Sequence, residues 1–190
     1  LETGWGRAGE TWQCLDTLAA LGGESWFRLG DRDLAVHLQR SARLRAGATL
    51  SAVSAELYAA HGIRHRALPM SDQPVSTLVQ CDTGTLAFQH YFVRERCAPR
   101  VRGFSFAGAA HARAAPGVLE ALGAADLAGV IICPSNPFLS IDPILAVGGV
   151  RAALAACAAP VIAVSPIVAG AALKGPTAKI MAELELPQSA

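Results

Sequence analysis

The sequence has few charged residues and no excess of either sign. Only 16% of its 190 residues are Asp, Glu, Lys or Arg, and the formal net charge at pH 7 is +1. A dedicated nucleic-acid-binding protein needs clustered excess Lys and Arg to neutralise phosphates, so this balance excludes that class. A hydrophobic content of 52% excludes a disordered chain, which needs low hydrophobicity and high net charge. We therefore expect a compact globular protein.

Cysteine is also scarce, and the five cysteines show no C-x-x-C spacing. An odd, widely spaced set is a poor framework for disulfides or for a structural zinc site, so we expect free thiols and a cytoplasmic protein. Residues 152–173 form an uncharged stretch long enough to span a membrane. We expect no span there, because Pro160 and Pro166 interrupt it and its many alanines insert weakly.

Several catalytic and nucleotide-binding motifs are missing as well. There is no G-x-x-x-x-G-K-[ST] and no G-x-G-x-x-G, so neither a P-loop NTPase nor a standard dinucleotide-binding fingerprint is indicated. The absence of G-x-S-x-G and H-E-x-x-H removes the common hydrolase and zincin classes.

The first third of the chain is predicted to be helical. A helix begins near Trp12 and is broken at Gly22–Gly23. Asp31 is predicted to cap a second helix that ends at Gly47, and Thr49 to start a third over residues 50–60.

The middle of the chain is predicted to be a β-rich lobe over residues 63–107. Short runs rich in β-branched and aromatic residues occupy positions 64–68, 76–81, 85–93 and 101–106. Residues 82–84, Asp-Thr-Gly, are a turn signal between the second and third runs.

Residues 116–190 are predicted to form a βαβ portion followed by a closing helix. The apolar runs 128–133 and 160–164 indicate parallel strands, the first buried on both faces, with helical sequence between them at 144–145 and 151–157. A helix over 117–122 precedes this unit and one over 176–186 closes it. The predicted fold class is α/β, with a Rossmann-like parallel sheet core and a β-rich lobe.

The loops that follow the two predicted strands are the candidate binding site, because ligands bind beyond the carboxyl ends of parallel strands. The first loop, residues 134–143, places hydroxyl and amide donors ahead of a helix start, which favours an anion. The second loop, residues 165–176, holds Lys174 just before the closing helix, where a phosphate would meet its ammonium group and the helix N-terminus. Each feature alone is equally well explained by a helix cap at Ser140 or Asp142, or by a solvated lysine. Together the two loops favour a phosphate-bearing ligand.

Five segments then occur in a recognisable order: Gly30–Ala35 with His37–Leu38, Leu68–Asp72, Phe88–Val93, Pro134–Leu145, and Val164–Val168 with Leu173–Pro176. Together they closely resemble the 2-phospho-L-lactate transferase family of coenzyme F(420) biosynthesis, and the resemblance covers nearly the whole chain. The sequence departs from the family pattern at Gly148, where Pro is expected, and at Ala169, where Gly is expected. Both departures concern local loop shape.

The resemblance implies an enzyme, a transferase that joins the deazaflavin FO to a phosphorylated three-carbon acid. The donor would be a guanosine diphospho-activated phospholactate or phosphoenolpyruvate. The terminal ribityl hydroxyl of FO would attack the phosphorus and GMP would leave, while the enzyme aligns the reactants and neutralises charge, with Mg²⁺ as cofactor. A cytoplasmic homodimer is expected, with neither nucleic acid nor membrane as a partner.

The resemblance also implies residue roles. Two sets of side chains are expected to bind substrates, one holding the nucleotide and phosphates and the other forming walls for the deazaflavin. The first set is Ser135, Asn136, Pro137, Ser140, Ser165, Lys174 and Gly175, and the second is Met70, Phe88 and His90. No catalytic residue is assigned.

Family members carry, before the segment matching Leu1, a further βα portion with a Gly-rich turn and acidic metal ligands. We therefore expect residues 1–190 to be a single transferase domain without that portion, with no metal ligands in this chain and the Mg²⁺ ligands upstream.

Two other functions stay open at this point. One is a non-catalytic nucleotide-sugar-binding regulator of related fold, and the other is a structural α/β domain whose loops bind nothing. The β-rich lobe favours the transferase, because only a transferase has an acceptor substrate for that lobe to hold.

Overall fold

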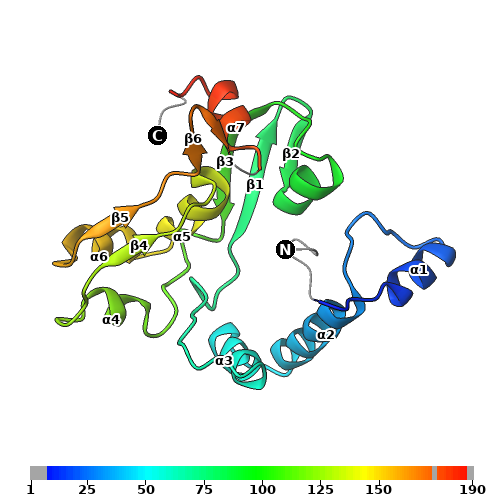
Figure 1. The fold of residues 1–190 in the computed structure, drawn as a ribbon, viewed down its shortest axis with the longest axis horizontal. Helices are drawn as coiled ribbons and strands as arrows, with labels where there is room; N and C mark the ends of the chain where they lie inside the picture. Colours follow the sequence, from blue (N-terminus) through cyan, green and yellow to red (C-terminus); the bar gives the residue numbers. More distant parts are fainter. Residues whose placement is uncertain (1–7, 173–174, 188–190) are drawn as a thin grey trace. The chain divides into compact units, whose positions relative to one another are not determined.

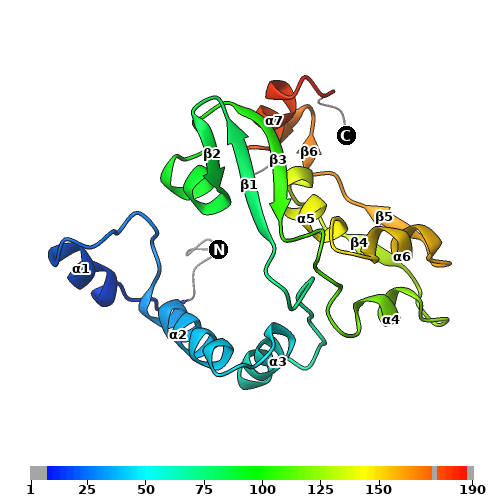
Figure 2. The same ribbon diagram turned by 180° about the vertical axis from the view of Figure 1, so that it is seen from behind.

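A computed structural model describes residues 8–172 and 175–187 of the chain. The protein is mixed α/β and divides into two compact units, residues 1–67 and 68–190 (Figures 1 and 2). In the described residues the first unit is helical, and the second contains all the strands. No helix among the described residues is long and apolar enough to cross a membrane.

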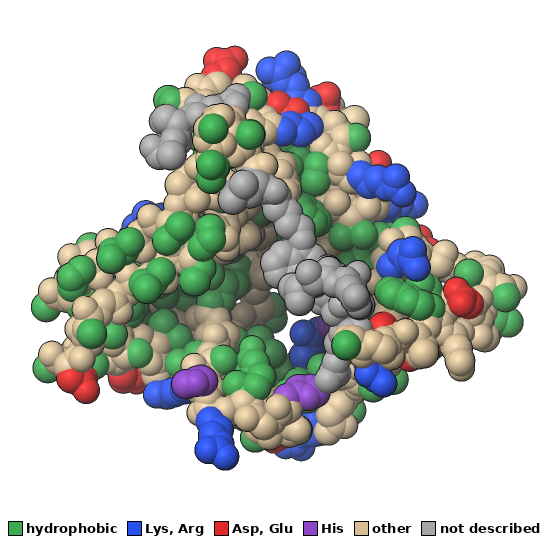
Figure 3. Space-filling model, viewed as in Figure 1, with side chains coloured by type: hydrophobic (Ala, Val, Ile, Leu, Met, Phe, Trp, Pro, Cys, Tyr) green, Lys and Arg blue, Asp and Glu red, His purple; other side chains and the backbone are tan. Residues whose placement is uncertain are grey.

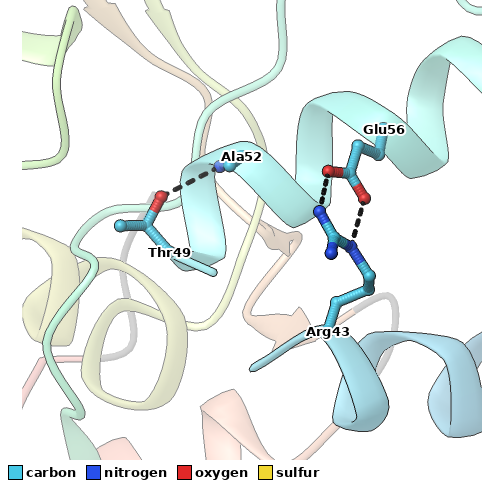
Figure 4. A network of polar contacts seen from close by, with 4 residues as sticks. All are labelled: Arg43, Thr49, Ala52 and Glu56. Carbon is cyan, nitrogen blue, oxygen red and sulfur yellow. Dashed lines mark hydrogen bonds and ion pairs between the residues drawn. The ribbon is translucent and has the colours of Figure 1, made fainter. Parts of the chain in front are cut away.

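The first unit consists of three helices close to the predicted positions, α1 (Gln13–Ala20), α2 (Asp31–Arg45) and α3 (Leu50–Ala60). The predicted start of α3 is confirmed, because the Thr49 hydroxyl accepts a hydrogen bond from the Ala52 N–H at 3.2 Å. A two-pronged contact joins α2 to α3: Arg43 Nε and Nη2 donate to the Glu56 carboxylate at 2.9 and 2.6 Å (Figure 4). This pairing lowers the pKa of Glu56.

The prediction that Asp31 caps its own helix is wrong. Its carboxylate accepts hydrogen bonds from the Gln13 and Cys14 N–H groups at 3.1 and 3.0 Å, which are the free donors at the start of α1. In return, Glu10 Oε1 accepts from the Arg32 N–H at 2.9 Å, at the start of α2. Each helix is thus capped by a carboxylate from another segment, and sequence spacing alone favours the local cap instead.

The β-rich portion of the second unit is a three-stranded antiparallel sheet in which β1 (Ser76–Cys81) lies between β2 (Gly84–Ala87) and β3 (Val101–Ala107). The strands β1 (Ser76–Cys81) and β3 (Val101–Ala107) confirm two predicted runs. The predicted strand at 64–68 does not form.

The predicted strand over residues 85–93 is correct only in its first part. Strand β2 (Gly84–Ala87) gives way to a π-helical turn, η1 (His90–Arg94). Tyr91 in this turn is completely buried. The turn carries the Tyr91 ring into the core, and burying an aromatic ring is worth more than adding ladder hydrogen bonds at the edge of a sheet.

The predicted βαβ unit is present, because β4 (Val130–Ile132) pairs in parallel with β5 (Val161–Ala163). The helices α5 (Asp142–Leu145) and α6 (Val150–Ala156) lie between them in sequence. A helix precedes the unit, α4 (Val118–Leu122).

The prediction that the first of these strands is buried on both faces is wrong for this chain. Ile131 is 67% exposed and its register partner Ile162 is 57% exposed. Hydrophobic side chains gather on the surface over β4, β5 and α6 (Figure 3). An apolar run favours a buried strand, but burial depends on what packs against the strand, and in the described residues this face of β4 and β5 is exposed.

Most of the second unit's core lies against the antiparallel sheet. Its buried members come from the sheet, the π-helical turn, the first loop and the closing helix α7 (Thr177–Glu183); they are Val79, Cys81, Tyr91, Val101, Leu139 and Ile180. A smaller cluster of Ala112, Val147 and Val150 lies near α5 and α6. Burial of Leu139 and Ile180 contributes about 1.5–3 kcal/mol each, so the core itself holds the first loop and α7 beside the sheet.

Candidate functional site

The first predicted binding loop is organised by Asn136. Its Oδ1 accepts hydrogen bonds from the Phe138 and Leu139 N–H groups, both at 3.0 Å, which caps the π-helical turn η2 (Pro137–Ile141). Its Nδ2 donates to the Thr177 hydroxyl of α7 at 3.1 Å. All three bonds are internal to the protein, so Asn136 positions the loop and joins it to α7.

The apolar residues of this loop anchor it to the sheet. The Phe138 ring stacks on Phe104 of β3, with centroids 5.7 Å apart and planes 9° apart. Leu139 is 6% exposed and lies in the core. The loop is therefore a folded element with a fixed shape rather than an open connection.

The remaining polar groups of the first loop are two serine hydroxyls. Ser140 is exposed and Ser135 half-buried, on either side of the half-buried Pro137. No hydrogen bond joins either hydroxyl to another residue of the described part of the chain. These hydroxyls are the loop's side-chain groups able to donate to a phosphate oxygen.

The second predicted loop contains a short hairpin that the sequence did not indicate, β6 (Ile167–Val168) with β7 (Ala171–Ala172). The Ser165 hydroxyl accepts from the Ile167 N–H at 3.1 Å and so closes the turn leading into β6. Ala169 has a φ of +52° at the hairpin tip, which explains why glycine is the expected residue there.

The end of the second loop leads into α7. Lys174 lies outside the described residues, and Gly175 is exposed with a φ of +73°. A Cβ atom added to Gly175 would lie 4.0 Å from Cε2 of Phe92. This glycine therefore brings the second loop next to the π-helical turn η1.

Helix α7 is held to the sheet by a polar network. Lys179 Nζ donates to the Pro99 carbonyl at 3.0 Å and pairs with Glu183 Oε1 at 2.6 Å, while Glu183 Oε2 accepts from the Val101 N–H at 3.0 Å. The Lys179 ammonium also lies 6.0 Å from the centre of the Tyr91 ring. These bonds hold α7, whose Thr177 hydroxyl accepts the hydrogen bond from Asn136. Helix α7 lies beside β3 in both ribbon views (Figures 1 and 2).

The three residues predicted as deazaflavin walls do not form one group. Met70 packs against the small cluster, whereas Phe88 packs against the core at the sheet. His90 is exposed in η1. Phe88 pairs with Phe92, their ring centroids 5.4 Å apart, so the aromatic surface next to Gly175 is built from these two rings.

The structure brings together some predicted residues and adds two that the sequence reasoning missed. Asn136 donates to Thr177 at the start of α7, and Gly175 lies two residues before Thr177 in the sequence. Thr177, 1% exposed, gave no signal because its partner is 41 residues away. Phe92 follows Phe88 by four positions, and that spacing was an available signal.

The described residues do not fit a magnesium site. Across residues 8–172 and 175–187, no group of three or more His, Cys, Asp or Glu side chains is arranged to hold a metal ion. Glu10 Oε1 and both oxygens of the Asp31 carboxylate accept hydrogen bonds from backbone N–H groups.

Comparison with known proteins gives the family. The model of the 2-phospho-L-lactate transferase CofD family matches residues 10–188. The chain belongs to the 2-phospho-L-lactate transferase CofD family. The match includes both predicted loops and the β-rich portion.

Relatives within the CofD family have two kinds of name. A "Phosphoenolpyruvate transferase" from Streptomyces griseus is 44% identical over all of this chain and 60% of its own length, and one from Mycolicibacterium smegmatis is 45% identical over 92% and 55%. A "2-phospho-L-lactate transferase" from Methanosarcina mazei is 39% identical over 93% of this chain and 57% of its own length. The chain thus spans less than two thirds of the length of these relatives.

Among solved structures, a Bacillus halodurans protein of the UPF0052 family is similar in fold, with a TM-score of 0.53 and 16% identity over 70% of this chain and 40% of that one. This likeness concerns the fold alone.

Proposed function

We propose that the protein of which this chain is part transfers a phosphorylated three-carbon acid from a guanosine diphospho-activated donor to the ribityl hydroxyl of FO, releasing GMP. Membership of the CofD family over residues 10–188 carries this proposal. The organised loop around Asn136 supports it, because it offers two serine hydroxyls beside an anchored helix.

The proposed role of this chain is to align the reactants. Phosphoryl-type transfers depend mainly on positioning and on neutralising charge. Asn136 holds the shape of the first loop through three hydrogen bonds. Ser135 and Ser140 then donate to phosphate oxygens of the donor, and Gly175 lets the backbone approach the substrates closely.

The donor is proposed to carry an enolpyruvyl rather than a lactyl group. The relatives named phosphoenolpyruvate transferase are 42–45% identical to this chain, against 39% for the phospholactate transferase. The two donors differ by two hydrogens, so the choice is tested by supplying each of them.

The experiment is product analysis by mass spectrometry with the full-length protein, FO and each synthetic donor. We expect an FO adduct carrying the enolpyruvyl phosphate, together with GMP. Ser140→Ala is expected to raise the KM for the donor, and Ser25→Ala, at an exposed serine of the first unit, is the matched control. Binding of guanine nucleotide without any turnover would instead support the non-catalytic regulator.

The domain organisation is part of the same proposal. The exposed Ile131 and Ile162 face is proposed to be covered by polypeptide outside residues 1–190, because parallel sheets are normally buried on both sides. That covering would complete a Rossmann-like core, and Mg²⁺ would be held by carboxylates outside this chain. Hydroxyl-radical footprinting of the full-length protein tests this, since slow oxidation of the Ile131 and Ile162 side chains is expected only if the face is covered.

A further inference from the structure

The π-helical turn η1 exposes one aromatic ring while burying its neighbour. Tyr91 is 0% exposed, with its ring beneath the Lys179 ammonium. Phe92, the next residue, is 39% exposed. Because Tyr91 anchors the turn to the core, Phe92 is held at the surface by a rigid element.

The backbone around this ring is unusual in two ways. The ring lies in a π-helical turn, which is a rare conformation, and η1 is followed by two non-glycine residues in the left-handed region, Arg96 at a φ of +49° and Cys97 at +59°. Such backbone conformations cost about 1–3 kcal/mol each and persist where the surrounding structure holds them. The Cys97 N–H donates to the Tyr91 carbonyl at 2.8 Å, which ties the strained turn back to the anchor.

Two neighbours border the exposed Phe92 ring. One side of the ring is met by Phe88, with centroids 5.4 Å apart. Another side faces Gly175, where even a methyl group would come to 4.0 Å from the Phe92 ring. Gly175 lies two residues before Thr177, whose hydroxyl accepts from Asn136, so the Phe92 ring and the organised loop both lie near the start of α7.

We propose that Phe92, backed by Phe88 and bordered by Gly175, is the stacking platform for a planar heteroaromatic ring of a substrate. This inference rests on the proposed function, in which both substrates carry such a ring, the deazaflavin of FO and the guanine of the donor. Any planar base can stack on an aromatic side chain, and this stacking contributes measurably to the binding affinity. Phe92 thereby sets where the ring lies relative to the first loop, as a specificity-determining residue.

The test is equilibrium binding to the full-length protein, with FO followed by its fluorescence and GDP by calorimetry. Phe92→Leu keeps an apolar side chain and removes the aromatic face, so the stacked ligand is expected to bind about tenfold more weakly. Phe92→Tyr is expected to keep wild-type affinity. Phe27→Leu is the matched control, because Phe27 is 40% exposed and lies in the other unit.

The ligand that loses affinity identifies the ring that stacks. A Phe88→Leu variant gives a second measurement that leaves Phe92 intact, and it is expected to weaken the same ligand because it removes the ring that backs Phe92. Wild-type affinity of Phe92→Leu for both ligands would overturn the platform while leaving the proposed function standing. Failure of the wild-type protein to bind either ligand would overturn the proposed function itself.

Discussion

Replacing Asn136 by alanine is expected to loosen the first loop and its junction with α7. The substitution removes the cap of η2, which is worth about 1 kcal/mol, and the bond to the buried Thr177 hydroxyl, worth about another 1 kcal/mol. We therefore expect the free energy of unfolding to fall by about 2 kcal/mol, measured by urea denaturation of the full-length protein. Asn136→Asp keeps the acceptor for both N–H groups and accepts from Thr177, so its loss should be smaller.

A double-mutant cycle isolates the bond between the two elements. Thr177→Val alone is expected to cost about 1 kcal/mol. Combined with Asn136→Ala, it should add almost nothing, which gives a coupling energy of about 1 kcal/mol. Strictly additive losses, or an Asn136→Ala protein as stable as the wild type, would refute the reasoning that Asn136 joins the loop to α7.

Three further outcomes are expected from other parts of the structure. Ala169→Gly should raise the free energy of unfolding by about 1 kcal/mol by relieving a left-handed backbone, whereas Gly170→Ala should lower it; equal stability of both variants would contradict this. Lys179→Met should lower it by about 1 kcal/mol, because the bond to the Pro99 carbonyl is lost, and an unchanged urea midpoint would argue against that bond. The pKa of Asp31 lies below its usual value of 3.8 because the Thr11 hydroxyl, and then backbone N–H groups, hydrogen-bond to the carboxylate. Its stabilising effect is therefore present above about pH 4 and lost as the pH falls through the folded-state pKa; helical circular dichroism should decline there, and Asp31→Asn should flatten that decline.

The local sequence pattern was sufficient to predict the elements whose stabilising contacts are close in sequence. The cap at Thr49 lies three residues from its donor, and the runs at 76–81 and 101–106 form strands because β-branched and aromatic residues suit a half-buried sheet. The order of apolar runs also predicted the parallel pairing of β4 with β5. The five ordered segments, which include both loops, resemble the family that the comparison confirms.

Tertiary structure decided the features that depend on distant partners. Asp31 caps α1 and not its own helix, because two segments pack so that its carboxylate meets free N–H groups 17 and 18 residues away. Asn136 acts on the shape of its loop because Thr177 is brought to it across 41 residues. Phe92 became part of the candidate site only when burial of Tyr91 turned a predicted strand into a π-helical turn. Sequence determines which groups are available to pair, but hydrogen bonding and burial are settled by distance in space, which only the folded chain fixes.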